Sequence, residues 1–500
     1  MDPNRVVYLD HAATTPVDPA VAQAMAACLG VDGDFGNAAS ATHVYGIRAA
    51  ARIERARAQV AAILGAEPDE IVFTSGATES ANLGILGAAR ANADRGRHIV
   101  TSRIEHKAVL DSVKRLEKEG FSVSWLTPGR GGGIDPDSVF RAIRADTVLV
   151  TLMHANNETG VIQDLVAVGS ACRERGVLFH TDAAQSVGKI PVDVRRQMVD
   201  LLSFTAHKIY GPKGIGALYV RRAKRAYVQP VSFGGGQERG LRPGTLATHQ
   251  IVGFGEACEI AGVRRSAESL RLAAMRDRLW TRLRPLGGVH CNGEACERIP
   301  GILNVSFEGV EGESLITALP QLAISTGSAC NSASADASYV LRALGRDTQL
   351  AQSSLRFSLG RLTSDSDVDF AAAAVAREVA RLRALSPAAA GCDPAQQPVE
   401  GGRDALIIGE GGGPGQEAWV RFELAVAGDI VKDARFKAYG CPHTVSVASW
   451  LAAQLPGRRR DNLIPGSPAG WAEAQAVPME KLGRLLTVED ALHACLRQWP

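Results

Sequence analysis

Between about residues 50 and 220, short apolar runs rich in β-branched residues alternate with longer segments that carry apolar residues at a helical period. Strands that alternate with amphipathic helices predict a mainly parallel sheet covered by helices on both faces. The predicted strands are residues 71–74, 98–101, 147–153, 177–181 and 216–220, and the predicted helices include 108–119 and 164–175. This part of the chain therefore favours an α/β fold.

The rest of the chain has a different pattern. A long charged amphipathic segment, 258–286, predicts a helix that leads into a smaller α+β unit with a strand at 302–307 and a terminal helix at 370–384. Residues 386–402 are rich in Pro, Ala and Gly and lack periodicity, which is typical of a linker. After it, 419–426 predicts a strand and 444–453 a helix.

We therefore expect four consecutive parts. They are a large domain over 1–257, which includes an N-terminal segment of the small domain, a small domain over 258–386, a linker over 387–402, and a C-terminal α+β domain over 403–500. A chain of 500 residues is expected to divide in this way.

Charge, cysteine content and apolar runs indicate which partners and which cell compartment to expect. The formal net charge of +2 does not favour nucleic acid or an anionic membrane, so small molecules and proteins are the expected partners. The nine cysteines are odd in number and scattered, which fits a reducing cytosol better than a disulfide framework. No signal-peptide pattern and no apolar run of about 18 residues occurs, so we expect a cytoplasmic protein with no membrane span.

The clearest chemical signal is Lys208, which is preceded by Thr205 and His207 and followed by a Gly-Pro turn. A lysine held in this way after a strand suits a Schiff base, in which the amine acts as nucleophile and base. A solvated surface lysine is the alternative. Upstream, Asp182 ends an apolar run. Its carboxylate either pairs with a protonated pyridine nitrogen or caps the next helix.

Two further segments suit a phosphorylated cofactor. Residues 74–80, at a predicted strand-to-helix junction, combine small residues with Thr78. The free N–H groups and dipole of such a helix start attract phosphate, although many ordinary helix caps have the same composition. His106 could stack on a cofactor ring and relay protons, or it could be structural.

A cysteine and an arginine are the remaining candidate site residues. Residues 325–334 form a small-residue segment with Cys330 at its centre. A structural cysteine would normally lie in an apolar run, so this position suits a carrier nucleophile. Arg356 lies on a strand-like run, where it could bind the carboxylate of an amino acid through two hydrogen bonds.

Taken together, residues 5 to about 386 resemble the cysteine desulfurases, within the fold type I, class V aminotransferase-like enzymes. The matching segments are 8–16, 35–37, 105–107, 153–158 and 234–245, and segment 327–330 with 338–345 is similar to the NifS/IscS-type branch. The resemblance implies pyridoxal 5'-phosphate as cofactor, L-cysteine as substrate, L-alanine as product and a persulfide on Cys330. It also implies a homodimer that passes sulfur to iron–sulfur scaffold or thiolation proteins. Another pyridoxal-phosphate lyase or aminotransferase of this fold, such as a selenocysteine lyase, is the alternative, and Cys330 argues against it.

The resemblance also implies a role for individual residues around the cofactor ring. Lys208 bonds the cofactor and moves the Cα proton of the substrate. His106 stacks on the ring and assists proton transfer. Asp182 pairs with the pyridine nitrogen, and Gln185 contacts the phenolic oxygen.

Phosphate and substrate contacts follow from the same resemblance. The implied phosphate ligands are the backbone N–H of Ala77 together with Thr78, Thr205, His207 and, from the second subunit, Thr245. Asn157, which also contacts the cofactor, and Arg356 orient the substrate, with Asn37 as a further candidate.

Residues 403–500 resemble, more distantly, the NifU/IscU-type iron–sulfur scaffold, most closely over 433–441. Such a scaffold holds its cluster with three cysteines. Of these only Cys441 is present, because residues 411–415 contain none and the third position falls near Arg484 rather than at Cys495. We therefore expect a degenerate scaffold domain. Cys441 stays open between an acceptor of the Cys330 persulfide, one ligand of a shared or metal site, and a relic in a structural module. No metal site is predicted beyond Cys330 or Cys441 as candidate cluster ligands.

Overall fold

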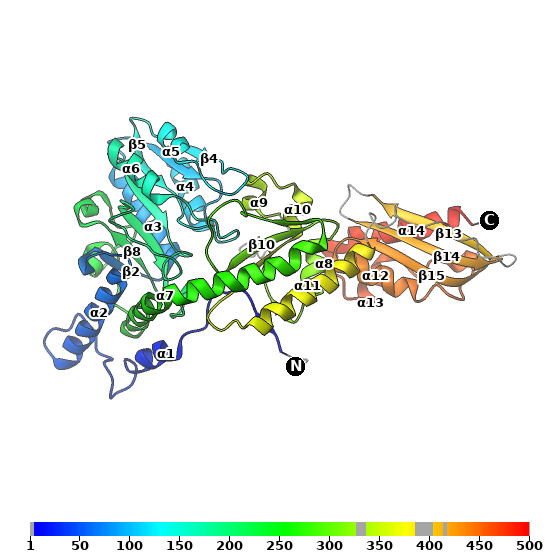
Figure 1. The fold of residues 1–500 in the computed structure, drawn as a ribbon, viewed down its shortest axis with the longest axis horizontal. Helices are drawn as coiled ribbons and strands as arrows, with labels where there is room; N and C mark the ends of the chain where they lie inside the picture. The colour runs from blue at the N-terminus through cyan, green and yellow to red at the C-terminus, as the bar shows by residue number, and fades with distance from the viewer. Residues whose placement is uncertain (1–4, 327–336, 386–403, 414–417, 500) are drawn as a thin grey trace.

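The computed structural model describes residues 5–326, 337–385, 404–413 and 418–499. A large sheet with its helices, a smaller α+β unit and a C-terminal unit follow one another along the long axis of the molecule (Figure 1). The predicted linker falls within residues 386–403, outside the described residues. Among the described helices, none combines the length and apolar character needed to cross a bilayer.

The large sheet has seven strands in the order β2-β8-β7-β6-β5-β3-β4. All neighbours are parallel except β8, which runs antiparallel to both β2 and β7. Successive residues of a strand enter opposite cores, as Leu178 and Phe179 do, because side chains alternate across a sheet. Burial on both faces explains the continuous apolar runs and confirms the predicted α/β fold. The strands are β2 (Ile71–Thr74), β3 (His98–Ser102), β4 (Ser122–Leu126), β5 (Thr147–Thr151), β6 (Leu178–Asp182), β7 (Leu201–Thr205) and β8 (Gly216–Val220).

The helices around this sheet begin where the sequence supplies a cap. His106 and Asp164, the N-caps of α4 and α6, each accept a hydrogen bond from a backbone N–H of the first turn. Both helices agree with the predicted segments to within a residue or so. The helices are α1 (Pro19–Ala26), α2 (Val44–Ala62), α3 (Ala77–Ala91), α4 (Lys107–Lys118), α5 (Pro136–Ala142) and α6 (Leu165–Arg175).

The connecting helix α7 (Thr248–Leu283) starts ten residues before the predicted position. Its first part contains Gly253 and Gly255, which weaken a helix when it is considered alone. A Cβ on Gly253 would lie 2.6 Å from Met25 Cγ, and one on Gly255 would lie 2.7 Å from Ala56 Cα. The glycines therefore let α1 and α2 approach closely, and this packing extends the helix.

The small unit is built on an antiparallel sheet of order β12-β10-β9, beside a parallel pair of β1 with β11. Its predicted strand at 302–307 and terminal helix are confirmed. The elements are β1 (Val7–Tyr8), β9 (Val289–Cys291), β10 (Ile302–Phe307), α8 (Gly312–Thr317), β11 (Leu322–Ala323), α9 (Tyr339–Ala343), α10 (Thr348–Gln352), β12 (Ser354–Ser358) and α11 (Asp365–Leu385).

The C-terminal unit has its own hydrophobic core around Phe422 and Trp471. It consists of an antiparallel sheet, β13 (Asp404–Gly412), β14 (Trp419–Ala427) and β15 (Ile430–Tyr439), with α12 (Pro442–Ala452), α13 (Pro468–Ala474) and α14 (Leu482–Arg497). The predicted strand and helix correspond to β14 and α12. Polar contacts join this unit to α8 and α10: Ser314 Oγ donates to Gly440 O (2.8 Å), Gln349 Nε2 donates to the Tyr439 hydroxyl (2.7 Å), and Lys481 pairs with Glu313 (3.0 Å).

Candidate active site

A cavity of about 560 Å³ lies where β2, β6 and β7 end. In open α/β sheets, ligands bind at this carboxyl edge because the strand-to-helix turns expose backbone and polar groups there. Most of the residues predicted from the sequence line it, namely Ala77, Thr78, His106, Asn157, Asp182, Gln185, Thr205, His207, Lys208 and Arg356. Local motifs scattered over 280 residues of sequence thus meet in one place.

One part of the wall suits a pyridine ring. Asp182 is buried at the end of β6, and its Oδ1 accepts the backbone N–H of Ala184 (2.9 Å). Lys208 ends the short 3-10 turn Ala206–Lys208 that follows β7. A buried carboxylate and an amine that face one cavity are the two groups that a cofactor with a basic ring nitrogen and an aldehyde requires.

Another part of the wall suits a phosphate. The first backbone N–H groups of α3 lack partners inside the helix, and Ala77 and Thr78 of this first turn line the cavity. Gly76, the N-cap of α3, lies beside Thr205, since a Cβ on Gly76 would be in ordinary van der Waals contact (3.8 Å) with Thr205 Oγ1. His207 Nδ1 lies 3.1 Å from Thr14 Oγ1, and burial together with the charge of Lys208 lowers the pKa of His207 to about 4.

His106 caps α4, where its Nδ1 accepts the N–H of Ala108 (3.2 Å). Burial lowers the pKa of His106, so the neutral imidazole is favoured, as stacking on a ring requires. The preceding residue, Glu105, is fully buried, and burial raises its pKa to about 8. Near neutral pH, the neutral forms of both Glu105 and His106 are therefore favoured.

Arg356 on β12 is held from several sides. It donates to Asn157 O (2.9 Å), Asp10 Oδ1 (2.7 Å) and Ser325 Oγ (3.2 Å). Its Nε and the Oδ1 of Asn157 are buried and have no hydrogen-bond partner among the described residues. Unsatisfied buried polar atoms are costly, so these two mark a place where a polar ligand binds.

Not every predicted site residue is found at this cavity. Asn37 and Thr245 line a separate cavity of about 300 Å³, beside the buried ion pair of Arg57 and Glu238 (2.7 Å). Cys330 lies outside the described residues. The described residues on both sides of it are tied to the cavity region, since Ser325 contacts Arg356 and Ser338 donates to Glu158.

Cys441 does not line the cavity. It is buried at the start of α12, with its Sγ 3.4 Å from Thr444 Oγ1. Within the described parts of the chain, no group of three or more His, Cys, Asp or Glu side chains is arranged to hold a metal ion.

Sequence reasoning missed two residues of this site. Lys213 lines the cavity, and Asp10 orients Arg356 across 346 positions of sequence. Asp10 lies inside the matched segment 8–16, so an alert reading of that segment could have found it. For Lys213 the nearest signal was its place in the turn after Lys208.

The comparisons with known proteins agree with this geometry. The family model for class-V aminotransferases matches residues 7–370. Cysteine desulfurase IscS of Azotobacter vinelandii is 56% identical over 381 residues, which are 76% of this chain and 94% of that protein. The chain belongs to the cysteine desulfurase family of class-V aminotransferases. IscS of Pseudomonas aeruginosa (strain UCBPP-PA14) is also 56% identical, over the same shares of both chains.

Solved structures of this family superpose on the chain. A NifS-like protein gives a TM-score of 0.70 at 36% identity and covers 75% of this chain and 100% of that one. A structure described as SspA in complex with cysteine gives 0.64 at 40% identity over 70% of this chain and 98% of that one.

As a member of this family the chain is an enzyme that uses pyridoxal phosphate. The residues of the cavity fit that cofactor. Lys208 would bond its aldehyde, Asp182 would pair with its ring nitrogen, and the start of α3 would hold its phosphate. The unsatisfied Oδ1 of Asn157 is a further polar group that a ligand can complete.

Proposed function

We propose that this enzyme removes the sulfur atom of L-cysteine and holds it as a persulfide on Cys330, with release of L-alanine. The observation that supports this most directly is the convergence of Lys208, Asp182 and Arg356 on one cavity. The reaction is balanced without an external oxidant: one thiol becomes a persulfide, and the substrate exchanges its sulfur for hydrogen at Cβ.

The chain supplies proton transfer and substrate orientation. Bound pyridoxal phosphate withdraws electrons from the substrate Cα. The amine of Lys208 would take the Cα proton of the substrate, and His106 would assist that transfer as a neutral imidazole. Arg356 and Asn157 bind the substrate carboxylate, and Asp10 keeps the guanidinium in place.

The thiolate of Cys330 then attacks the substrate sulfur. The new S–S bond forms as the Cβ–S bond breaks, and the electron pair of that bond stays with the carbon, which later takes a proton. A thiolate is the reactive form of cysteine, so this step depends on deprotonation of Cys330. The contacts of Ser325 with Arg356 and of Ser338 with Glu158 support a role for the intervening segment in this reaction.

We further propose a cytoplasmic homodimer. Several large apolar side chains between residues 29 and 47 are exposed, and Val31 and Phe233 are 84% and 85% exposed. Large apolar side chains with such high exposure are typical of a surface that another protein covers. Thr245 lies away from the cavity of its own chain, as expected if it reaches the phosphate of the second subunit. The seven cysteines within the described residues form no disulfide, which supports a reducing compartment.

For the C-terminal unit we propose a degenerate NifU/IscU-like module. Its β-sheet-plus-helix architecture and Cys441 at the start of a helix support that assignment. The first scaffold cysteine is expected within 411–415, which contains none, and at Gly411 a Cβ would lie 2.2 Å from Thr487 O. Cys441 remains a candidate sulfur acceptor. Because its thiol is buried beside the contact of Gly440 with Ser314, it would need the module to move away from α8.

Peptide mass spectrometry after mixing the protein with pyridoxal phosphate and L-cysteine, without reductant, tests the proposal. We expect one added sulfur on Cys330 and stoichiometric L-alanine, and Cys330→Ser should bind the cofactor but release no sulfide. Alanine formation without an adduct on Cys330 would instead favour a simple lyase. An adduct that also reaches Cys441 would support internal transfer.

A further inference from the structure

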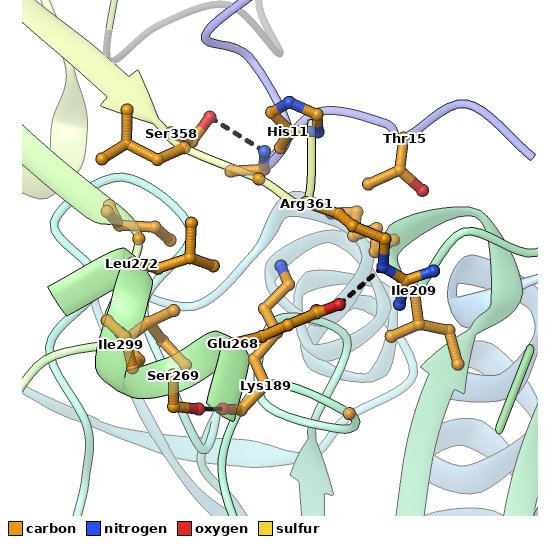
Figure 2. A pocket seen from close by; sticks show the side chains of 18 of the residues that line it. His11, Thr15, Lys189, Ile209, Glu268, Ser269, Leu272, Ile299, Ser358 and Arg361 are labelled. Carbon is orange, nitrogen blue, oxygen red and sulfur yellow. Dashed lines mark hydrogen bonds and ion pairs between the residues drawn. The ribbon is translucent and has the colours of Figure 1, made fainter. Parts of the chain in front are cut away.

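Behind the cofactor cavity lies a second, smaller cavity of about 40 Å³, into which the amine of Lys189 points (Figure 2). Ala12 and Lys208 line both cavities. Gln185 lines the cofactor cavity, whereas Lys189 lines the rear one. Gln185 and Lys189 therefore lie at the boundary between the cofactor cavity and the rear cavity, where they contact each other.

The carboxamide of Gln185 is held at both ends. Its Nε2 donates to Ala12 O (2.9 Å), and its Oε1 accepts from Lys189 Nζ (2.9 Å). A carbonyl oxygen only accepts, so the Ala12 contact determines which end carries the nitrogen. The amide nitrogen has two N–H groups, and Ala12 uses one of them. The other is left to donate toward a ligand in the cofactor cavity.

We propose that Lys189 is a positioning residue for the cofactor: it holds the Gln185 carboxamide so that the second Nε2 N–H donates to the phenolic oxygen of pyridoxal phosphate. This inference rests on the proposed function, in which Gln185 faces that oxygen. Without Lys189, Oε1 loses its donor and the carboxamide can rotate. The directed hydrogen bond to the cofactor would then be lost.

The charge of Lys189 adds to this effect. Burial, together with the positive charges of Lys208 and Arg356, lowers the pKa of Lys189 to about 7. A hydrogen-bond donor and a nearby positive charge both favour negative charge on the phenolic oxygen. The charged and titratable groups that face the Lys189 amine or the rear cavity are His11, His207, Lys208, Tyr210, Arg265, Glu268, Arg356 and Arg361. Among these, Glu268 forms an ion pair with Arg361 (2.7 Å; Figure 2). Its negative charge therefore offsets that arginine and does not neutralise the other positive charges near Lys189.

Lys189→Met tests the proposal, because methionine has a similar length but lacks both the donor and the charge. We expect the pH midpoint of the visible absorption change of the bound cofactor, without substrate, to rise by about half a unit or more. We also expect apo-protein to bind pyridoxal phosphate about threefold to tenfold more weakly at pH 8.5, where most Lys189 amines are neutral and the hydrogen bond alone is probed. Lys118→Met, on the exposed end of α4, is the matched control and should leave both values unchanged.

A double-mutant cycle separates positioning from general structure. If Lys189 acts through Gln185, adding Lys189→Met to Gln185→Leu should cause no further loss of affinity at pH 8.5. Additive losses, or a lower melting temperature with an unmoved absorption midpoint, would overturn the proposal. If wild-type protein fails to bind pyridoxal phosphate at all, the proposed function fails instead.

Discussion

At the scale of single residues, the site depends on polar groups whose neighbours hold them in one charge state. Glu105 lies next to His106 and is fully buried, and its Oε1 accepts from Ser102 Oγ (2.7 Å) and Met153 N (2.9 Å). Its Oε2 has no partner within the described residues. A carboxylate in this position is poorly solvated, and the proton therefore stays on it to about pH 8.

The stability of the Glu105→Gln variant, measured relative to wild type, should increase as pH rises. The folded pKa of about 8 lies above the ordinary value of 4.5 for a glutamate side chain, so between these values the folded state binds a proton that the unfolded state has lost. Wild-type stability therefore falls as pH rises through this window, and glutamine, which mimics the protonated acid, removes the loss. Melting temperatures at pH 5.5 and 8.5 check this, with the exposed Glu473→Gln as control. A constant difference between variant and wild type at both pH values would contradict the assignment.

Arg356→Lys should weaken substrate binding. Lysine keeps the charge but cannot donate at once to Asn157, Asp10 and a substrate carboxylate, as the planar guanidinium can. Loss of a charge-assisted hydrogen bond of about 1.5–3 kcal/mol corresponds to a rise in KM for L-cysteine of about tenfold to a hundredfold. Steady-state alanine formation measures this. An unchanged KM would show that Arg356 only braces Ser325 and Asp10.

At the scale of elements, close backbone packing decides what the C-terminal module can hold. β13 runs against α14 so tightly that a Cβ on Gly409 would lie 2.4 Å from Cys495 Sγ, and one on Gly411 would lie 2.2 Å from Thr487 O. The glycines of β13 therefore serve the packing of a helix on a sheet. The same stretch is where a cluster scaffold would need a thiolate.

Gly411→Cys should therefore destabilise the module rather than restore a ligand. The clash is with backbone atoms, which cannot move aside cheaply, so we expect a loss of about 2 kcal/mol or more in unfolding free energy. Gly413→Cys is the matched control, because nothing lies within 4 Å of a Cβ at that position. Denaturant titration of both variants gives the comparison. Equal stabilities would show that β13 and α14 can separate at little cost.

At the scale of the whole molecule, the C-terminal module has its own core and touches the small unit mainly through α8, α10 and α11. The polar contacts between the two are few, and the Lys481–Glu313 pair is partly exposed. Partly exposed ion pairs add little stability, typically below about 1 kcal/mol. Among the described residues, those that line the catalytic cavity all precede the module.

Deletion of the residues after Ser386 should leave a folded enzyme with full cofactor content and at least half of the wild-type rate of alanine formation. The reason is that the cavity and the first two cores contain no residue of the module. Absorbance of the bound cofactor and alanine assays measure this. A truncated chain that is insoluble, or that lacks cofactor, would show that the module is part of the catalytic fold.

The sequence by itself determined the local elements and the types of chemistry. Short apolar runs between helical segments predicted β2, β3, β5, β6 and β8 closely, because the residue types that favour a buried strand can be read from the local sequence. The sequence placed Lys208 after a strand and Asp182 at the end of an apolar run, and the structure brings both to one cavity. The resemblance then named the cofactor and the reaction.

Only the tertiary structure decided the contacts between distant segments. It paired Asp10 with Arg356, joined Lys189 and Gln185 to Ala12, and separated Thr245 from the cavity of its own chain. It also started α7 early, through glycines that a local scale counts as unfavourable, and closed the space at Gly411. Such contacts depend on how whole elements pack, and the local pattern of a helix or strand does not specify which distant element will contact it.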